Sequence, residues 1–146
     1  MDKKYQIFIS STYKDLIEER RKVQDTILSM NHFPVGMELF SADDDEQWDV
    51  IKRTIDTSDY YVLIIANRYG SVIESGEDAG ISYTEKEFRY ALSKEIPVHV
   101  FLIDKDAQVK ASDMEDDRKK KKKLDSFKAE AMSGRTVEWW LNKDDL

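Results

Sequence analysis

The sequence predicts a three-layer α/β fold in which a five-stranded parallel sheet is covered by helices on both faces. Two observations carry this prediction. Segments with strand character alternate with segments of helical periodicity in the order βαβαβαβαβ, which is typical of a parallel sheet. Two of the strand segments, DYYVLIIAN at 59–67 and IPVHVFLID at 96–104, are almost continuously apolar, as expected for strands that are buried on both faces.

The N-terminal half is expected to form two strand–helix units. A strand at 5–10 leads into a helix at 14–30, whose start we place at a capping box of Asp15 and Glu18. The apolar stripe of this helix is Leu16, Val23, Ile27 and Met30. A second strand at 33–40 precedes a second helix that is capped near Asp44 or Asp45. The apolar face of the second helix is Trp48, Ile51 and Ile55.

The C-terminal half is expected to hold the central strand at 59–67, a helix that begins near residue 82, strands at 96–104 and 135–140, and a helix at 119–132. Residues 105–123 are expected to form a flexible charged connection, because they offer little apolar surface to bury. Residues 1–146 are predicted to be a single domain. The last residues resemble a helix start, with Asn142 and Asp145 as its caps, that does not continue. We therefore expect a domain excised from the N-terminus of a longer protein.

Composition excludes several classes of function. The chain has no cysteine, so it has neither disulfides nor thiolate metal sites. It has no apolar run of about 20 residues and no signal peptide, so we expect a cytoplasmic protein without a membrane partner. With 30 acidic and 23 basic residues its formal charge is −7, which argues against nucleic-acid binding. The basic run RKKKKK at 118–123 directly follows the acidic DMEDD at 113–117 and is interpreted as a solvated segment that leads into a helix.

No motif indicates a metal or a bound cofactor. Glycine-rich nucleotide loops are absent from the sequence. His32 and His99 are isolated and lie in or beside strands, where a packed histidine is the simpler interpretation. The acidic DDDE at 43–46 lies at a helix start, which favours acids without any metal. We predict that there is neither a metal nor a cofactor.

Two glutamates at the start of the third helix are candidates for chemistry. Ser82 with Glu85, or Thr84 with Glu87, could form a capping box, so a purely structural role is open for both acids. Glu85 faces Arg89 one turn later, as in an ordinary surface ion pair. Glu87 flanks the apolar stripe on the other side. The aromatic residues at i−4 and i+3 from Glu87 are Tyr83 and Tyr90.

The predicted topology indicates where a ligand would bind. In the flavodoxin-like strand order 2-1-3-4-5, ligands bind beyond the carboxyl ends of strands 1 and 3. Hydroxyl groups follow strand 1 at a helix N-terminus, which suits an anion; they belong to Ser10, Ser11 and Thr12. After strand 3, Arg68 could bind a phosphate, Tyr69 follows it, and Gly70 permits close backbone approach. Turn and capping roles for the hydroxyls, and an internal ion pair for Arg68, remain open alternatives.

The chain resembles a known family in several segments. IFISSTYKDLIEERRKV, DYYVLIIANRYGS, ISYTEKEFRYAL and PVHVFL closely resemble the bacterial domain-of-unknown-function family 4062. That family occurs at the N-terminus of signalling ATPases of the STAND type and is considered TIR-like (Toll/interleukin-1 receptor-like). In NAD-consuming TIR domains, an aromatic residue precedes the catalytic glutamate by four positions, and Tyr83 and Glu87 match that spacing. The aromatic there is commonly tryptophan.

The resemblance implies a TIR-like effector domain of a bacterial signalling or antiphage defence protein. Its activity would be that of an NAD nucleosidase, with Glu87 as the catalytic residue and Ser10, Ser11, Thr12, Arg68, Tyr69, Gly70 and Tyr83 as substrate-binding residues. A single carboxylate is sufficient for this reaction, because nicotinamide leaves as a neutral group and needs no general acid. NAD would be the substrate, and the full-length protein would self-associate. A non-catalytic TIR-like self-association or adaptor module, and an enzyme related to nucleoside deoxyribosyltransferases, are the alternatives.

Overall fold

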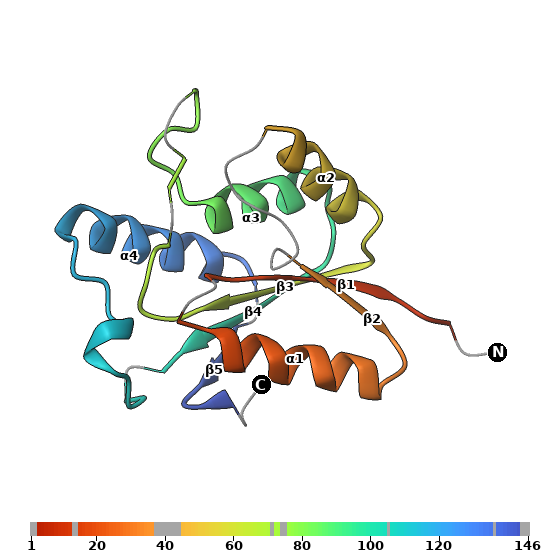
Figure 1. Ribbon diagram of the computed structural model, residues 1–146, viewed down its shortest axis with the longest axis horizontal. Coiled ribbons are helices and arrows are strands. Elements are labelled where there is room, and N and C mark those ends of the chain that lie inside the picture. Colours follow the sequence, from red (N-terminus) through yellow and green to blue (C-terminus); the bar gives the residue numbers. More distant parts are fainter. Residues whose placement is uncertain are drawn as a thin grey trace.

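The computed structural model describes residues 3–12, 15–36, 45–70, 72–73, 76–104, 106–135 and 137–143. Its strands are β1 (Gln6–Ser10), β2 (Phe33–Gly36), β3 (Tyr60–Ile65), β4 (Val98–Ile103) and β5 (Val137–Trp140). They form one sheet in the order β2-β1-β3-β4-β5 (Figure 1). Each neighbouring pair of strands is parallel. The predicted three-layer α/β fold and the strand order 2-1-3-4-5 are confirmed.

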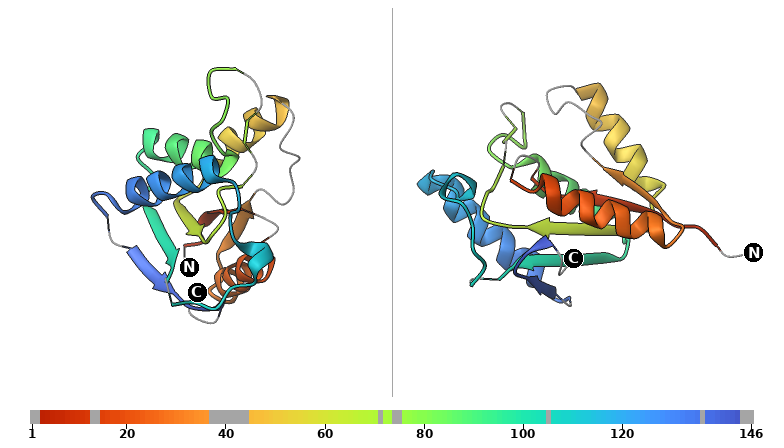
Figure 2. Two further views of the ribbon diagram at one scale, coloured as in Figure 1. Left: turned by 90° about the vertical axis from the view of Figure 1, so that its left-hand side faces the viewer. Right: turned by 60° about the horizontal axis from the view of Figure 1, so that its bottom comes forward.

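The four α-helices in the described part of the chain are divided unequally between the two faces of the sheet. Helix α1 (Ile17–Ser29) lies on one face, and α2 (Asp45–Asp56), α3 (Tyr83–Ser93) and α4 (Arg118–Met132) lie on the other (Figures 1 and 2). Two apolar clusters follow this division. One contains Ile51 of α2, Phe88 of α3 and Phe127 of α4, and the other contains Val23 and Ile27 of α1.

Strand β3 is buried on both faces, as its continuous apolar run predicts. Tyr61, Leu63 and Ile65 belong to the cluster beneath α2, α3 and α4. Val62 and Ile64 alternate with them and belong to the cluster beneath α1. Successive side chains of a strand point to opposite faces, so a strand between two helical layers needs apolar residues at every position.

The start and the end of α1 differ from the prediction. The helix begins at Ile17, and its N-cap Leu16 makes no side-chain capping bond, so the capping box of Asp15 and Glu18 is wrong. Asp15 instead accepts a hydrogen bond from the hydroxyl of Thr12. Met30 follows the last helical residue and is 57% exposed. It does not belong to the buried stripe, because the chain leaves the helix at this point.

The other boundaries agree with the prediction to within a few residues. On the apolar face predicted for the second helix, Ile51 and Ile55 are buried, and Trp48 packs against the same cluster. Residues 37–40, Asp44 and Asp145, on which parts of the prediction rest, lie outside the described residues. No helix among the described residues is long and apolar enough to span a membrane.

The connection between β4 and α4 contains ordered contacts. Residues Ala111–Asp113 form a 3₁₀ turn, and α4 already begins at Arg118, so residues 118–123 are helical. Asp117 caps the helix by accepting hydrogen bonds from the amides of Lys119 and Lys120 over 2.9 and 3.2 Å. The flexibility expected for residues 105–123 stays a prediction.

Candidate functional site

The end of β1 meets a carboxylate of α3. The hydroxyl of Ser10, the last residue of β1, donates a hydrogen bond to Glu87 Oε1 over 2.8 Å. Ser10 is 0% exposed and Glu87 is 1% exposed, so the pair is enclosed by the protein. Ser10 lies beside Leu63 of β3 in the sheet. The two side chains therefore meet between β1 and β3, where the strand order reverses and ligands of such sheets bind.

Helix α3 carries Glu87 inward because of where the helix begins. The Oγ atom of Ser82 accepts a hydrogen bond from the amide of Glu85 over 3.0 Å, so Ser82 is the N-cap of the two candidates considered. Thr84, Glu87, Phe88 and Ala91 are all buried. Their spacing of i, i+3, i+4 and i+7 describes one helical stripe. Glu87 thus belongs to the buried stripe itself, whereas the sequence pattern placed it on the flank of the stripe.

Charged groups approach the end of β1 from both faces of the sheet. Arg20 of α1 is 2% exposed and donates to Ser11 Oγ over 2.8 Å and to the carbonyl oxygen of Ile9 over 3.2 Å. Burial, and then the charge of Glu87, raise the pKa of the fully buried Tyr61 phenol well above its ordinary value, and the charge of Arg20 opposes this rise. A buried cation such as Arg20 and a buried carboxylate such as Glu87 both need hydrogen-bonding or charged partners in an apolar interior.

The segments that follow β1 and β3 lie against each other. Gly70 has φ +91°, and a Cβ atom at this position would lie 2.8 Å from Thr12 Cγ2. The close approach that the sequence suggested at Gly70 is therefore made to Thr12. Ser11 donates to the carbonyl oxygen of Thr12 over 2.6 Å. Together with the bonds of Ser10 to Glu87 and of Thr12 to Asp15, this leaves all three predicted hydroxyls in internal hydrogen bonds.

The surroundings of these hydroxyls are acidic. Burial raises the pKa of Asp15, with a further contribution from Asp113, while Thr12 and Arg68 lower it. Burial also raises the pKa of Glu19, and the charges of neighbouring acids add to the rise. A phosphate near the start of α1 would have to approach these carboxylates and displace internal hydrogen bonds. Among the described residues no group of three or more histidine or acidic side chains is arranged to hold a metal ion.

The loop after β3 is tied to the connection before α4. Arg68 Nη1 donates to the carbonyl oxygen of Ser112 over 3.0 Å. The amide of Tyr69 donates to Glu115 Oε1 over 3.0 Å, and the amide of Glu115 donates to the carbonyl oxygen of Asn67 over 2.7 Å. The predicted phosphate-binding Arg68 is thus bound to backbone, and its positive charge lowers the pKa of Asp15.

The two tyrosines that flank Glu87 in the sequence differ in their surroundings. Tyr83 is the first residue of α3 and is half-buried, one turn before Glu87. The Tyr90 hydroxyl donates to Asp56 Oδ1 of α2 over 2.7 Å, and its ring meets that of Trp48 edge to face at 5.9 Å. Tyr90 therefore joins α3 to α2, and Tyr83 is the aromatic residue that shares the first turns of α3 with Glu87.

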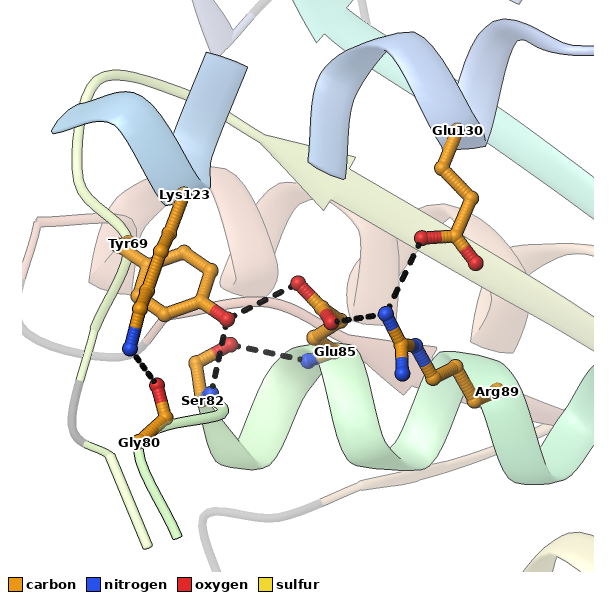
Figure 3. Close-up of polar contacts among 7 residues, drawn as sticks. All are labelled: Tyr69, Gly80, Ser82, Glu85, Arg89, Lys123 and Glu130. Carbon is orange, nitrogen blue, oxygen red and sulfur yellow. Dashed lines mark hydrogen bonds and ion pairs between the residues drawn. The ribbon is translucent and has the colours of Figure 1, made fainter. Parts of the chain in front are cut away.

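Glu85 lies in a separate network on the other side of α3 (Figure 3). Its Oε1 accepts a hydrogen bond from the hydroxyl of Tyr69 over 2.9 Å, and its Oε2 lies 2.7 Å from Arg89 Nη2. The same Tyr69 oxygen accepts from the amide of Ser82 over 3.1 Å. The Glu85 side chain is 7% exposed. The predicted i,i+4 pair with Arg89 is confirmed, but its surface character is not, because Tyr69 covers the carboxylate and links it to the helix cap.

Three residues of the site were missed from the sequence. Arg20 had a detectable signal, since it lies between Leu16 and Val23 on the buried stripe of α1, where a cation needs an internal partner. Tyr61 gave little signal, because its hydroxyl group is carried by a residue of an apolar strand. Glu115 had no signal, because only the tertiary fold brings the connection to the loop after β3.

Comparison with known protein families gives a match over nearly the whole chain. The family model described as "Domain of unknown function (DUF4062)" matches residues 6–146. None of the curated proteins matches the chain.

Proposed function

We propose that this chain, which belongs to the family described as domain of unknown function DUF4062, is a TIR-like effector domain that cleaves the nicotinamide N-glycosidic bond of NAD. The observation that supports the proposal is the buried Ser10–Glu87 hydrogen bond at the reversal of strand order. A carboxylate is costly to enclose, and enclosed ionisable groups in a crevice are frequent at functional sites. The proposed setting is a cytoplasmic signalling or antiphage defence protein with an ATPase of the STAND type.

The reaction needs little from the protein beyond charge and orientation. The bond between C1′ of the ribose and the pyridinium nitrogen breaks, and its electron pair leaves with nicotinamide, which becomes neutral. Water then attacks C1′ of the oxocarbenium-like ribosyl group and releases a proton, which gives ADP-ribose. A carboxylate fixed beside C1′ stabilises the positive charge that develops in the transition state.

In this proposal Glu87 supplies that charge without forming a bond to the substrate. Ser10 orients the carboxylate through the 2.8 Å hydrogen bond, and Tyr83, one turn earlier on α3, flanks the nicotinamide. Ser11, Thr12, Arg68, Tyr69 and Gly70 follow β1 and β3 and are the proposed contacts to ribose and phosphates. Since Glu87 is 1% exposed, the domain must open before the substrate can reach it. Self-association of the full-length protein is the proposed cause of that opening.

A second candidate function is a non-catalytic TIR-like module that only self-associates or recruits a partner. The observation that favours it is the enclosure of Glu87 together with the internal hydrogen bonds of Ser10, Ser11 and Thr12. In this alternative the Ser10–Glu87 pair joins α3 to β1 and has no substrate.

Nicotinamide release from NAD distinguishes the two candidates. The activated full-length protein is compared with its Glu87→Ala variant and with Glu138→Gln, a change to an exposed carboxylate of β5. An NAD-cleaving enzyme releases nicotinamide in the wild type and in Glu138→Gln but not in Glu87→Ala. A module of the second kind releases none in any of the three, while Glu87→Ala alters its self-association in analytical ultracentrifugation.

A further inference from the structure

A pocket lies between the first half of α3 and the middle of α4, on the side of α3 that carries Glu85. Its volume is about 280 Å³. Phe127 and Tyr69, which are each 2% exposed, and the partly buried Ile81 form its apolar part. Glu87 does not line this pocket. The Ser10–Glu87 pair and this pocket are therefore two different places on the domain.

Two lysines at the mouth of the pocket contact no described carboxylate. Lys122 and Lys123 both line the pocket and are exposed. Lys123 Nζ donates to the carbonyl oxygen of Gly80 over 2.6 Å (Figure 3). Within the described ranges, the ion pairs of the protein involve other cations. The contact to a neutral carbonyl fixes the position of Lys123 at the mouth, and no carboxylate in the described part of the chain pairs with its charge.

The position of these lysines on the helix adds to the excess of positive charge. Six consecutive basic residues, 118–123, occupy the first six positions of α4. Neighbouring like charges repel, and the partial positive charge at the N-terminus of this helix is already met by the capping carboxylate of Asp117. The fold gains no described ion pair from this arrangement at Lys122 and Lys123. A bound anion would compensate the charge of these two lysines.

The remaining charges of the pocket balance one another in part. Arg89 Nη2 lies 2.7 Å from Glu85 Oε2 and 3.6 Å from Glu130 Oε2 (Figure 3). The pocket is lined by three cationic side chains and two carboxylates, which leaves one positive charge. Glu130 is only partly buried, so its carboxylate can accept hydrogen bonds from hydroxyl or amino groups of a ligand.

From these features we infer that the pocket binds a nucleoside monophosphate. Lys122 and Lys123 take the phosphate, the apolar part beside Phe127 takes the base, and Glu130 accepts hydrogen bonds from the ribose hydroxyls. The volume is just below the range of about 300–1,000 Å³ that is usual for ligand pockets, so it suits a mononucleotide better than a dinucleotide. The inference does not rest on the function proposed for Glu87, although Tyr69 is named in both.

Calorimetric titration of the 146-residue chain with AMP at low salt tests the inference. The Lys122→Gln/Lys123→Gln variant should bind AMP at least about tenfold more weakly than the wild type, because two charge-assisted phosphate contacts are lost. Lys119→Gln/Lys121→Gln is the matched control, since it removes the same charge from the same run at exposed positions that do not line the pocket. It should stay within about threefold of the wild type, as a salt-screened distant charge has little effect. Equal far-UV circular dichroism and melting temperatures verify the fold of both variants.

Adenosine and inorganic phosphate separate the two parts of the ligand. Each should bind at least about tenfold more weakly than AMP, because each makes only part of the contacts. Three results would overturn the inference: no binding of AMP by the wild type at millimolar concentration, an equal loss in the two double variants, or binding of inorganic phosphate as tight as that of AMP.

Discussion

Replacing Glu85 by alanine should destabilise the domain far more than a surface position would. The substitution removes the acceptor of the Tyr69 hydroxyl, which is a charge-assisted hydrogen bond between buried groups worth about 1.5–3 kcal/mol. It also removes the ion pair with Arg89, whose side chain is 52% exposed, so that this pair adds only about 0.2–1 kcal/mol. The free energy of unfolding should therefore fall by about 2–4 kcal/mol, or about 5–15 °C in melting temperature.

Glu130→Ala is the matched control for this prediction. Glu130 pairs with the same Arg89, at 3.6 Å, and its side chain is 40% exposed, so its loss should cost no more than about 0.5 kcal/mol. Urea denaturation followed by tryptophan fluorescence and circular dichroism measures both variants. If Glu85→Ala lies within about 0.5 kcal/mol of Glu130→Ala, which is the spread of ordinary surface substitutions, then Tyr69 and Glu85 do not form the buried contact described above.

Three further predictions concern the loops around the site. Gly70→Ala should reduce stability by about 1–3 kcal/mol and more than Gly76→Ala does, because both glycines have φ near +90° but only the first meets another side chain within 4 Å; equal losses in urea denaturation would contradict this. Burial raises the native pKa of Asp15 above 3.8, so the native state binds this proton more readily than the unfolded state. The native state therefore loses stability as the pH rises from the unfolded-state pKa of Asp15 to its higher native pKa. Asp15→Asn should accordingly gain stability relative to the wild type between about pH 3 and 7, and a constant difference would refute the argument. Glu115→Ala should raise the hydrogen exchange rate of the Tyr69 amide at least about tenfold without a change in β3, since it removes the acceptor of that amide; unchanged exchange would show that the connection does not hold this loop.

The sheet could be predicted from the sequence because its signals are local. Strands β3 and β4 appear as continuous apolar runs, and alternation of strands with helices restricts the connections to parallel crossovers. The start of α3 could be reduced to two candidates, Ser82 and Thr84, since both fit a capping box. The choice between them depends on Tyr69. Its hydroxyl oxygen accepts the hydrogen bond from the amide of Ser82 that the glutamate side chain would accept in a capping box.

The charged interior was less predictable, because its contacts are made between distant segments. Helical periodicity places Glu85 and Glu87 on opposite sides of a stripe, but it does not show that both sides are covered, one by Tyr69 and the other by β1. Arg20 could have been detected from its place on the apolar stripe of α1. Its partners, the hydroxyl of Ser11 and a carbonyl of β1, could not.

The central claim, that Glu87 stabilises the transition state of NAD cleavage, is tested most directly by measuring turnover and NAD affinity together for Glu87→Gln. The amide keeps the size of the side chain and an acceptor for Ser10 but removes the negative charge. In the activated full-length protein the rate of nicotinamide release should fall by about 10²–10³, while the dissociation constant for NAD changes by less than about threefold, because the lost interaction belongs to the transition state. Turnover by Glu87→Gln at the wild-type rate would contradict the claim.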